Sequence, residues 1–219
     1  MTETVGQKVA RMLLDIEAVH VSDDKPFIFT SGKASPVYID CRKIISFPKE
    51  RRFLMREGAA MMADLSKDSP YDAVAGGETA GIPFAAWMSE ELDKPMQYIR
   101  KKPKGFGRDA QIEGLIEDGQ HILLVEDLAT DGGSKLNFIN AIRTAGANVN
   151  HIFVIFYYDI FKDAMTKLAD ENVSLHYLAT WWDVLAAIKQ DPSYSDERVA
   201  KVEAFLNAPI EWSKANGGA

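Results

Sequence analysis

Two adjacent acids follow an unbroken apolar run in the stretch HILLVEDLATDGGSK at residues 121–135. The apolar segment ILLV at 122–125 is typical of a strand buried on both faces, because an amphipathic strand would alternate. Glu126 and Asp127 then stand at the carboxyl end of this strand, which is the edge where open α/β sheets bind ligands. Carboxylates at that edge can accept hydrogen bonds from neutral hydroxyl groups.

The turn after the two acids has the composition of a phosphate site. Its backbone N–H groups, with the hydroxyls of Thr130 and Ser134, can surround one phosphate at the start of a helix predicted over residues 134–145. The order DGGSK lacks the Gly-Lys-Ser/Thr of a nucleoside triphosphate loop, and the chain contains no GxGxxG dinucleotide motif. Acids beside a phosphate pocket therefore favour a sugar phosphate as the ligand.

A second polar loop, GGETAGIP at residues 76–83, follows another predicted strand. Its glycines permit a close approach of the backbone to a ligand, and Glu78 and Thr79 lie between them. The helix that starts near Pro83 presents unpaired N–H groups to an anion. A plain tight turn explains this segment equally well.

A third loop, RKKPKGFGR at residues 100–108, carries five cations and no acid. Pro103 and the two glycines make a regular conformation unfavourable, so the loop is predicted to be a mobile cationic segment. A solvated charge run or an RNA contact would also account for its charge. Only a place beside the other two loops would link it to an anionic ligand.

The composition is that of a soluble globular protein, with 47% hydrophobic and 26% charged residues. A formal net charge of -7 argues against a general nucleic-acid or anionic-membrane surface. Cys41 is the only cysteine, and the four histidines show no metal-ligand spacing, so a reducing cytoplasm is the expected location. The sequence shows neither a signal peptide nor an apolar run of membrane-spanning length.

Strands and helices alternate along most of the chain, which predicts an α/β fold with a mostly parallel sheet. An amphipathic helix over residues 5–19 opens the chain, and core packing is favoured there over binding of a partner. The segments 26–32 and 35–41 are predicted to be a hairpin or paired strands. The predicted helices that follow are 48–65, 81–93, 134–145, 161–171, 181–190 and a surface helix at 195–207, and the predicted strands are 71–77, 96–102, 121–127, 149–159 and 174–179.

Three motifs resemble those of a known enzyme family. LLVEDLATDGGSK at residues 123–135 resembles the binding motif of the type I phosphoribosyltransferases. FIFTSGKASPVYIDCR at residues 27–42 is similar to the N-terminal signature of orotate phosphoribosyltransferases, and RKKPKGFG at 100–107, followed by IEG, is similar to their catalytic loop. Together the motifs cover roughly residues 27–160 in the family order.

The resemblance implies a type I phosphoribosyltransferase fold: one α/β domain over residues 1–219, with a mostly parallel central sheet flanked by helices. Residues 1–45 would contribute a small N-terminal hood over the base site. It further implies a cytoplasmic glycosyltransferase of pyrimidine (UMP) biosynthesis, which transfers the phosphoribosyl group of phosphoribosyl diphosphate to orotate. Mg²⁺ would be bound mainly through the diphosphate and ribose of the substrate, and a homodimer would share its active sites.

The resemblance also implies residue roles. Catalytic roles fall on Lys104, Lys101, Arg100 and Asp127. The residues predicted to bind substrate, from the resemblance and from the loops above, are Glu126, Asp127, Leu128, Ala129, Thr130, Asp131, Gly132, Gly133, Ser134, Tyr38, Ile39, Lys33, Glu78 and Thr79.

The sequence departs from the family pattern at two positions. Phe106 stands in the cationic loop where the family commonly has a histidine. Ile160 follows Asp159 where many members have an arginine that pairs with the orotate carboxylate. Lys33, Arg42 and backbone N–H groups of residues 31–35 are the alternative partners for that carboxylate.

Two other functions fit parts of the sequence. A phosphoribosyltransferase for another base, such as a purine, would keep the sugar-phosphate motif. A nucleotide-sensing regulator on the same fold would need an added helix-turn-helix or a broad basic face, and this acidic chain shows neither. The pair Trp181 and Trp182 is assigned to core or dimer packing in preference to a binding platform.

Overall fold

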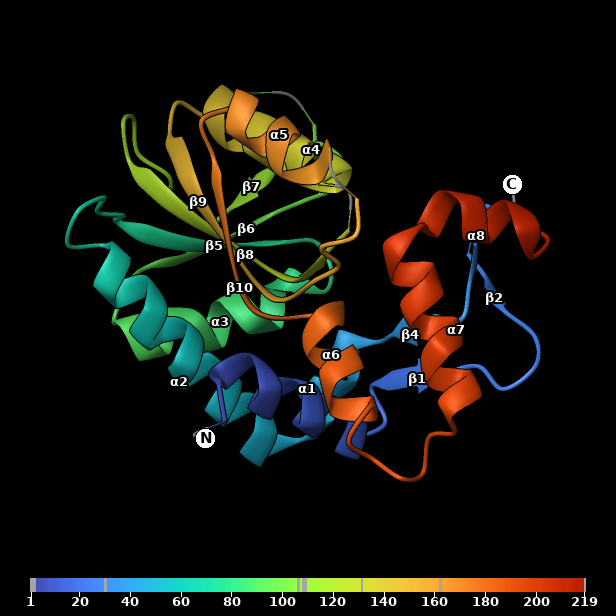
Figure 1. The fold of residues 1–219 in the computed structure, drawn as a ribbon. Helices are drawn as coiled ribbons and strands as arrows, with labels where there is room; N and C mark the ends of the chain where they lie inside the picture. The colour runs from blue at the N-terminus through green and yellow to red at the C-terminus, as the bar shows by residue number, and fades with distance from the viewer. Residues whose placement is uncertain are drawn as a thin grey trace.

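The computed structural model describes residues 3–29, 31–105, 107, 110–130, 132–161 and 163–218, and the backbone but not the side chain of Ser134. Six strands form the central sheet in the order β10–β9–β8–β5–β6–β7 (Figure 1). Neighbouring strands pair in parallel except β6 and β7, which are antiparallel. The predicted α/β fold with a mostly parallel sheet is confirmed. The strands are β5 (Ala73–Gly77), β6 (Met96–Ile99), β7 (Ile112–Glu113), β8 (His121–Ala129), β9 (Asn148–Tyr157) and β10 (Ser174–Thr180).

Helices cover both faces of this sheet (Figure 1). Along β8 the buried side chains alternate between two hydrophobic clusters, with Leu123 and Val125 on one side and Ile122 and Leu124 on the other. This explains the unbroken apolar run, because both faces of the strand are removed from water. The first cluster is covered by α1 (Val5–Asp15), α2 (Pro48–Leu65), α3 (Gly81–Leu92) and α6 (Trp181–Ile188), and the second by α4 (Gly133–Thr144) and α5 (Asp163–Asp170).

Helix α1 is shorter than the sequence predicts. A capping box between Thr4 and Gln7 starts the helix, as the side chains and backbone N–H groups of these residues bond reciprocally. The helix ends at Asp15 because Glu17 takes a left-handed conformation with φ of 53°. Val19, which fits the helical spacing, therefore belongs to a strand and not to the helix. By contrast, α2 has the predicted bounds, with Pro48 in its first turn.

The segment between β6 and β8 is more ordered than the predicted loop. Strand β6 ends at Ile99, so Arg100 and the residues after it leave the sheet. Ile112 then pairs with Ile99 and Glu113 with Tyr98, which adds β7 as an antiparallel edge strand. The cationic loop is thus the connection of a hairpin, and both of its ends are fixed by the sheet.

Four short strands form two small sheets beside the main one (Figure 1). β1 (Val19–Val21) pairs with β4 (Val37–Ile39), and β2 (Phe27–Ile28) pairs with β3 (Ala34–Ser35), both antiparallel. A six-residue 3-10 helix, η1 (Cys41–Ser46), leads from β4 to α2. The predicted pairing of 26–32 with 35–41 is confirmed for β2 and β3, whereas β4 takes β1 as its partner. From here on, the hood denotes the segment from β1 to β4 together with the two C-terminal helices described next, in place of the expected residues 1–45.

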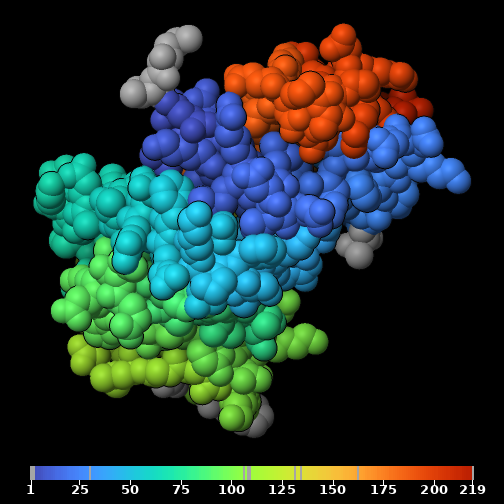
Figure 2. All heavy atoms as spheres, turned by 90° about the horizontal axis from the view of Figure 1, so that it is seen from below, coloured from blue at the N-terminus to red at the C-terminus, as the bar shows by residue number. Residues whose placement is uncertain are grey.

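The C-terminal helices α7 (Asp196–Asn207) and α8 (Pro209–Ala215) lie against these strands. Ser213 Oγ accepts a buried hydrogen bond of 2.9 Å from the Ala34 N–H, and Arg198 Nη2 donates one of 2.8 Å to the Val21 carbonyl. Figure 2 shows the orange and red C-terminal residues against the blue N-terminal ones. The predicted surface helix at 195–207 therefore buries one face, which includes Phe205, and α8 was not predicted.

Within the described residues, no helix combines the length and the apolar character that crossing a bilayer requires.

Candidate active site

The three polar loops meet at the carboxyl edge of the sheet. A Cβ on Gly77, the last residue of β5, would overlap Oε1 of Glu126, so the end of β5 lies against this acid of β8. The cationic loop contacts the loop after β5 through Lys101, whose backbone N–H donates a hydrogen bond of 2.8 Å to Glu78 Oε2. Asn137 of α4 in turn donates to the Lys101 carbonyl at 3.4 Å. The predicted convergence of the three loops is confirmed for these residues.

The two acids differ in their surroundings although each side chain belongs to a residue only 7% exposed. Glu126 Oε2 lies 2.7 Å from the Nζ of Lys135, which is 3% exposed in the first turn of α4. Asp127 instead faces a cavity. Burial raises the pKa of both carboxyl groups, and the charge of Lys135 opposes that rise in both.

Helix α4 begins at a backbone turn that only glycine adopts readily. Gly132, its N-cap, has φ of 76°, in the left-handed region. Gly132 has no side chain that could cap the helix, and the positive end of the helix dipole is what an anion would meet at this terminus.

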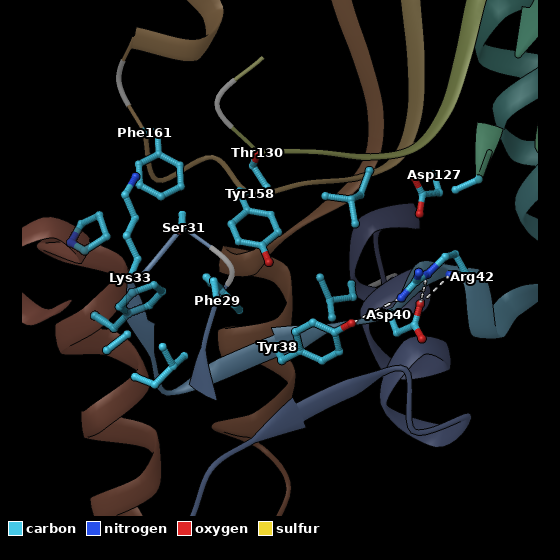
Figure 3. Close-up of a pocket in the computed structure, with 17 residues that line it drawn as sticks. Phe29, Ser31, Lys33, Tyr38, Asp40, Arg42, Asp127, Thr130, Tyr158 and Phe161 are labelled. Carbon is cyan, nitrogen blue, oxygen red and sulfur yellow. Dashed lines mark hydrogen bonds and ion pairs between the residues drawn. The ribbon is translucent and has the colours of Figure 1, made fainter. Parts of the chain in front are cut away.

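A cavity of about 750 Å³ lies between the hood and the edge of the sheet (Figure 3). Its walls come from the hood strands and η1, from the ends of β8 and β9, and from both C-terminal helices. The lining consists mainly of aromatic and aliphatic side chains with a few polar groups among them, which is the usual character of a small-molecule site. The lining residues are Ile28, Phe29, Ser31, Lys33, Ala34, Tyr38, Ile39, Asp40, Arg42, Ala80, Asp127, Leu128, Thr130, Tyr158, Phe161, Phe205 and Pro209.

Two cations reach this cavity and have different partners (Figure 3). Arg42 Nε donates to Asp40 Oδ1 at 2.7 Å, and the bond to this carboxylate raises the Arg42 pKa. Lys33 Nζ lies 5.0 Å from the centre of the Phe161 ring, and no carboxylate of the described residues pairs with it. Burial also raises the pKa of Tyr158, so its phenol stays neutral as a hydrogen-bond donor.

None of the described residues of the cationic loop lines this cavity. Arg100 Nη1 contacts Glu113 Oε1 of β7 at 3.3 Å, while Lys101 and Lys104 are exposed. The Lys104 N–H donates a hydrogen bond of 2.8 Å to the Ala110 carbonyl, which closes the loop. Phe106, one of the two departures from the family pattern, lies outside the described residues.

Comparisons with known proteins agree on one family. A model of the phosphoribosyl transferase domain matches residues 52–177. The orotate phosphoribosyltransferase of Ruegeria sp. (strain TM1040) is 52% identical over 214 residues, which cover 98% of this chain and 95% of that protein. The chain belongs to the orotate phosphoribosyltransferase family.

Solved structures of the family share the fold. Orotate phosphoribosyltransferase from Aeropyrum pernix is 30% identical with a TM-score of 0.70, over 83% of this chain and 98% of that one. UMP synthase from Leishmania donovani is 27% identical with a TM-score of 0.77, over 93% of this chain. The chain spans only 42% of the length of that UMP synthase.

Seven of the residues that the sequence analysis names individually line the cavity: Lys33, Tyr38, Ile39, Arg42, Asp127, Leu128 and Thr130. Others lie nearby but do not line it: Glu126, Ala129, Gly132, Gly133, Glu78 and Thr79. Asp131 and the side chain of Ser134 lie outside the described residues. Ile160, the second departure from the family pattern, packs against the core, while its neighbour Phe161 lines the cavity.

Sequence reasoning missed several members of the site. Phe29, Tyr158, Phe161 and Phe205 line the cavity, yet each also fits the pattern of an ordinary core residue. The apolar face of the helix at 195–207 was the available signal for Phe205. Lys135 was missed because a lysine in the first turn of a helix is normally solvated, and only its spacing from Glu126 hints at an ion pair.

Proposed function

We propose that the protein transfers the phosphoribosyl group from phosphoribosyl diphosphate to orotate, giving orotidine 5-phosphate and diphosphate, in pyrimidine (UMP) biosynthesis. One observation beyond family membership carries this proposal. The cavity brings an aromatic wall from the hood together with an acid and the phosphate turn at the end of β8. A base would pack against the aromatic wall, and a sugar phosphate would bind at the acid and the turn.

The sugar phosphate is assigned to the end of β8 and the start of α4. The Asp127 carboxylate would accept hydrogen bonds from the ribose hydroxyls, since it faces the cavity. The backbone N–H groups of residues 130–134 would receive the 5-phosphate at the positive end of α4. The left-handed conformation of Gly132 supports this assignment, because a glycine at the N-cap leaves no side chain between the helix terminus and a phosphate.

The base is assigned to the hood side of the cavity. Tyr38 and Phe29 would pack against the pyrimidine ring, and their rings already lie 6.3 Å apart, centre to centre. The orotate carboxylate has two candidate partners, Lys33 and Arg42. They differ in that Arg42 shares its charge with Asp40, whereas Lys33 faces an aromatic ring.

Transition-state charge explains the need for the cationic loop. Breaking the anomeric bond leaves positive character on the ribose and negative charge on the departing diphosphate. Arg100, Lys101 and Lys104 would stabilise that charge, and closure of the loop would exclude water from the activated sugar. No side chain has to form a covalent intermediate.

Mg²⁺ is the proposed cofactor. Among the described residues no group of three or more His, Cys, Asp or Glu side chains could hold a metal ion. Magnesium needs few protein ligands when a substrate supplies phosphate oxygens, and the Asp127 carboxylate is a hard oxygen donor that faces the cavity. The residues present therefore fit an ion held mainly by substrate, which would neutralise charge on the leaving diphosphate.

We also propose a cytoplasmic homodimer in which part of the cationic loop serves the neighbouring subunit. The exposed Lys104, which does not line the cavity of its own chain, supports a role across an interface. Mixing a Lys104→Ala subunit with an Asp127→Asn subunit tests this. Shared sites should restore activity in the mixture, whereas independent sites should leave it inactive.

A substrate panel tests the main proposal. Purified protein with Mg²⁺ and phosphoribosyl diphosphate is offered orotate, uracil, adenine and hypoxanthine in separate reactions. Consumption of orotate alone is expected. Turnover of a purine instead of orotate would contradict the assignment of the hood side of the cavity to a pyrimidine carboxylate.

The same panel separates the two candidate cations. Whichever of Lys33→Met and Arg42→Met raises the KM for orotate, while the KM for phosphoribosyl diphosphate stays constant, identifies the partner of the carboxylate. If neither variant does so, a backbone N–H group of residues 31–35 takes that role.

A further inference from the structure

A buried ion pair joins the first acid of the site to helix α4. Lys135 Nζ lies 2.7 Å from Glu126 Oε2, and the two side chains are 4% and 9% exposed. Removing two charges from water is unfavourable enough that an apolar pair of similar volume often gives equal or greater stability. The ion pair therefore indicates a role other than stability alone.

The ion pair spans the turn that would bind phosphate. Glu126 belongs to β8 and Lys135 to the first turn of α4, so residues 130–134 run between the two charges. The contact fixes the end of the strand relative to the start of the helix. The contact therefore brackets the segment to which the 5-phosphate is assigned.

The second oxygen of Glu126 contacts the loop after β5. Oε1 is buried and has no hydrogen-bond partner among the described residues. A Cβ on Gly81 would lie 2.5 Å from this oxygen, and one on Gly77 would overlap it. One carboxylate thus contacts α4 through Oε2 and fills the space beside the two glycines with Oε1.

We propose that Lys135 is a positioning residue for the transferase reaction. Its ion pair with Glu126 sets the spacing between the turn at 130–134 and the loop at 76–81 that phosphoribosyl diphosphate requires. Lys135 does not line the cavity, so it acts through Glu126 and not on the substrate. The inference rests on the proposed function and adds a residue to it.

Replacing Lys135 by methionine tests the proposal, because methionine keeps much of the side-chain volume without the charge. The KM for phosphoribosyl diphosphate should rise about 10- to 100-fold, taking the range known for residues that support a metal ligand. The KM for orotate should stay constant. Calorimetric titration with phosphoribosyl diphosphate should show the same loss of affinity.

Rescue by arginine provides a readout that loss of packing alone would not give. Lys135→Arg keeps a positive charge beside Glu126 Oε2, whereas Lys135→Met removes it. The KM for phosphoribosyl diphosphate should therefore be lower in Lys135→Arg than in Lys135→Met.

Lys189→Met is the matched control. Lys189 Nζ also lies 2.7 Å from a glutamate oxygen, that of Glu203, but both side chains are 44% exposed and the pair joins α6 to α7. This variant should leave both KM values unchanged. If the affinity for phosphoribosyl diphosphate falls in Lys135→Met and not in Lys189→Met, the loss is due to the buried ion pair.

The double variant Glu126→Gln/Lys135→Met covers the case in which the single variant does not fold. It removes both charges, so it should regain thermal stability but keep the raised KM for phosphoribosyl diphosphate. A double variant with wild-type stability and wild-type KM would overturn the proposal. So would a folded Lys135→Met with an unchanged KM for phosphoribosyl diphosphate.

If the wild-type protein does not consume orotate, the proposed function fails, and the calorimetric affinities still decide the role of Lys135.

Discussion

Replacing Gly77 by alanine should destabilise the fold and weaken binding of phosphoribosyl diphosphate together. The new methyl group would overlap Glu126 Oε1 and lie 2.5 and 2.8 Å from two ring carbons of Phe138. Glu126 is held by Lys135, and Phe138 is only 3% exposed, so neither neighbour can turn away into solvent. Overpacking of this kind costs about 1–3 kcal/mol.

The expected change in melting temperature follows from the length of the chain. An unfolding entropy of about 2.1 cal/mol/K per residue gives roughly 460 cal/mol/K for the 219 residues. The destabilisation therefore corresponds to a fall in Tm of about 2–7 °C. Differential scanning calorimetry measures this fall, and steady-state kinetics measure the accompanying rise in the KM for phosphoribosyl diphosphate.

Gly119→Ala is the control for a glycine that has open space around it. A Cβ at this position meets no heavy atom within 4 Å, although φ is +78°. Backbone strain alone should lower its stability, by about 1–2 kcal/mol, and both KM values should stay at the wild-type level. A Gly77→Ala protein that keeps the wild-type Tm and KM would refute the packing of Glu126 against this glycine.

Three further predictions concern other parts of the molecule. Lys104→Ala should lower the turnover about 10²- to 10³-fold with an unchanged Tm, since the side chain is exposed, and a wild-type rate would count against its assigned role. Ser213→Ala should cost about 1–3 kcal/mol, because it leaves the Ala34 N–H without its buried acceptor, and an unchanged urea midpoint would contradict this. Burial lowers the pKa of His176 from 6.5 to about 4. The unfolded chain therefore binds more protons between these pH values, and the stability should fall as the pH drops from about 6.5 to 4. The urea midpoint of His176→Gln should depend less on pH across that window, and an equal dependence would exclude this histidine as the cause.

The sequence predicts elements whose stability is encoded locally. The bounds of α2 follow from Pro48 and from the apolar spacing up to Leu65, and β8 follows from an apolar run that has no helical period. These signals lie within a few residues of the elements that they specify. The predicted convergence of the three loops then follows from the parallel sheet, because strand ends of the same sense share one edge.

The missed elements depend on contacts between distant residues. β1 is three residues long and pairs with β4, and α8 meets β3 through the bond between Ser213 and Ala34. The local sequence pattern does not show either of these two pairings. The same reason applies to Lys135, since its helical position predicts solvation and only the folded chain brings it to Glu126. Family resemblance directed attention to Ile160, whereas the adjacent Phe161 reaches the cavity.

The hood brings segments that are far apart in the sequence together around the cavity. The bond between Ala34 and Ser213 links residues 179 positions apart, and that between Arg198 and Val21 links residues 177 apart. Contacts of such separation form late, because the closure of long loops must precede them. During synthesis the central sheet can therefore assemble first, and the cavity can close only after α8 has left the ribosome.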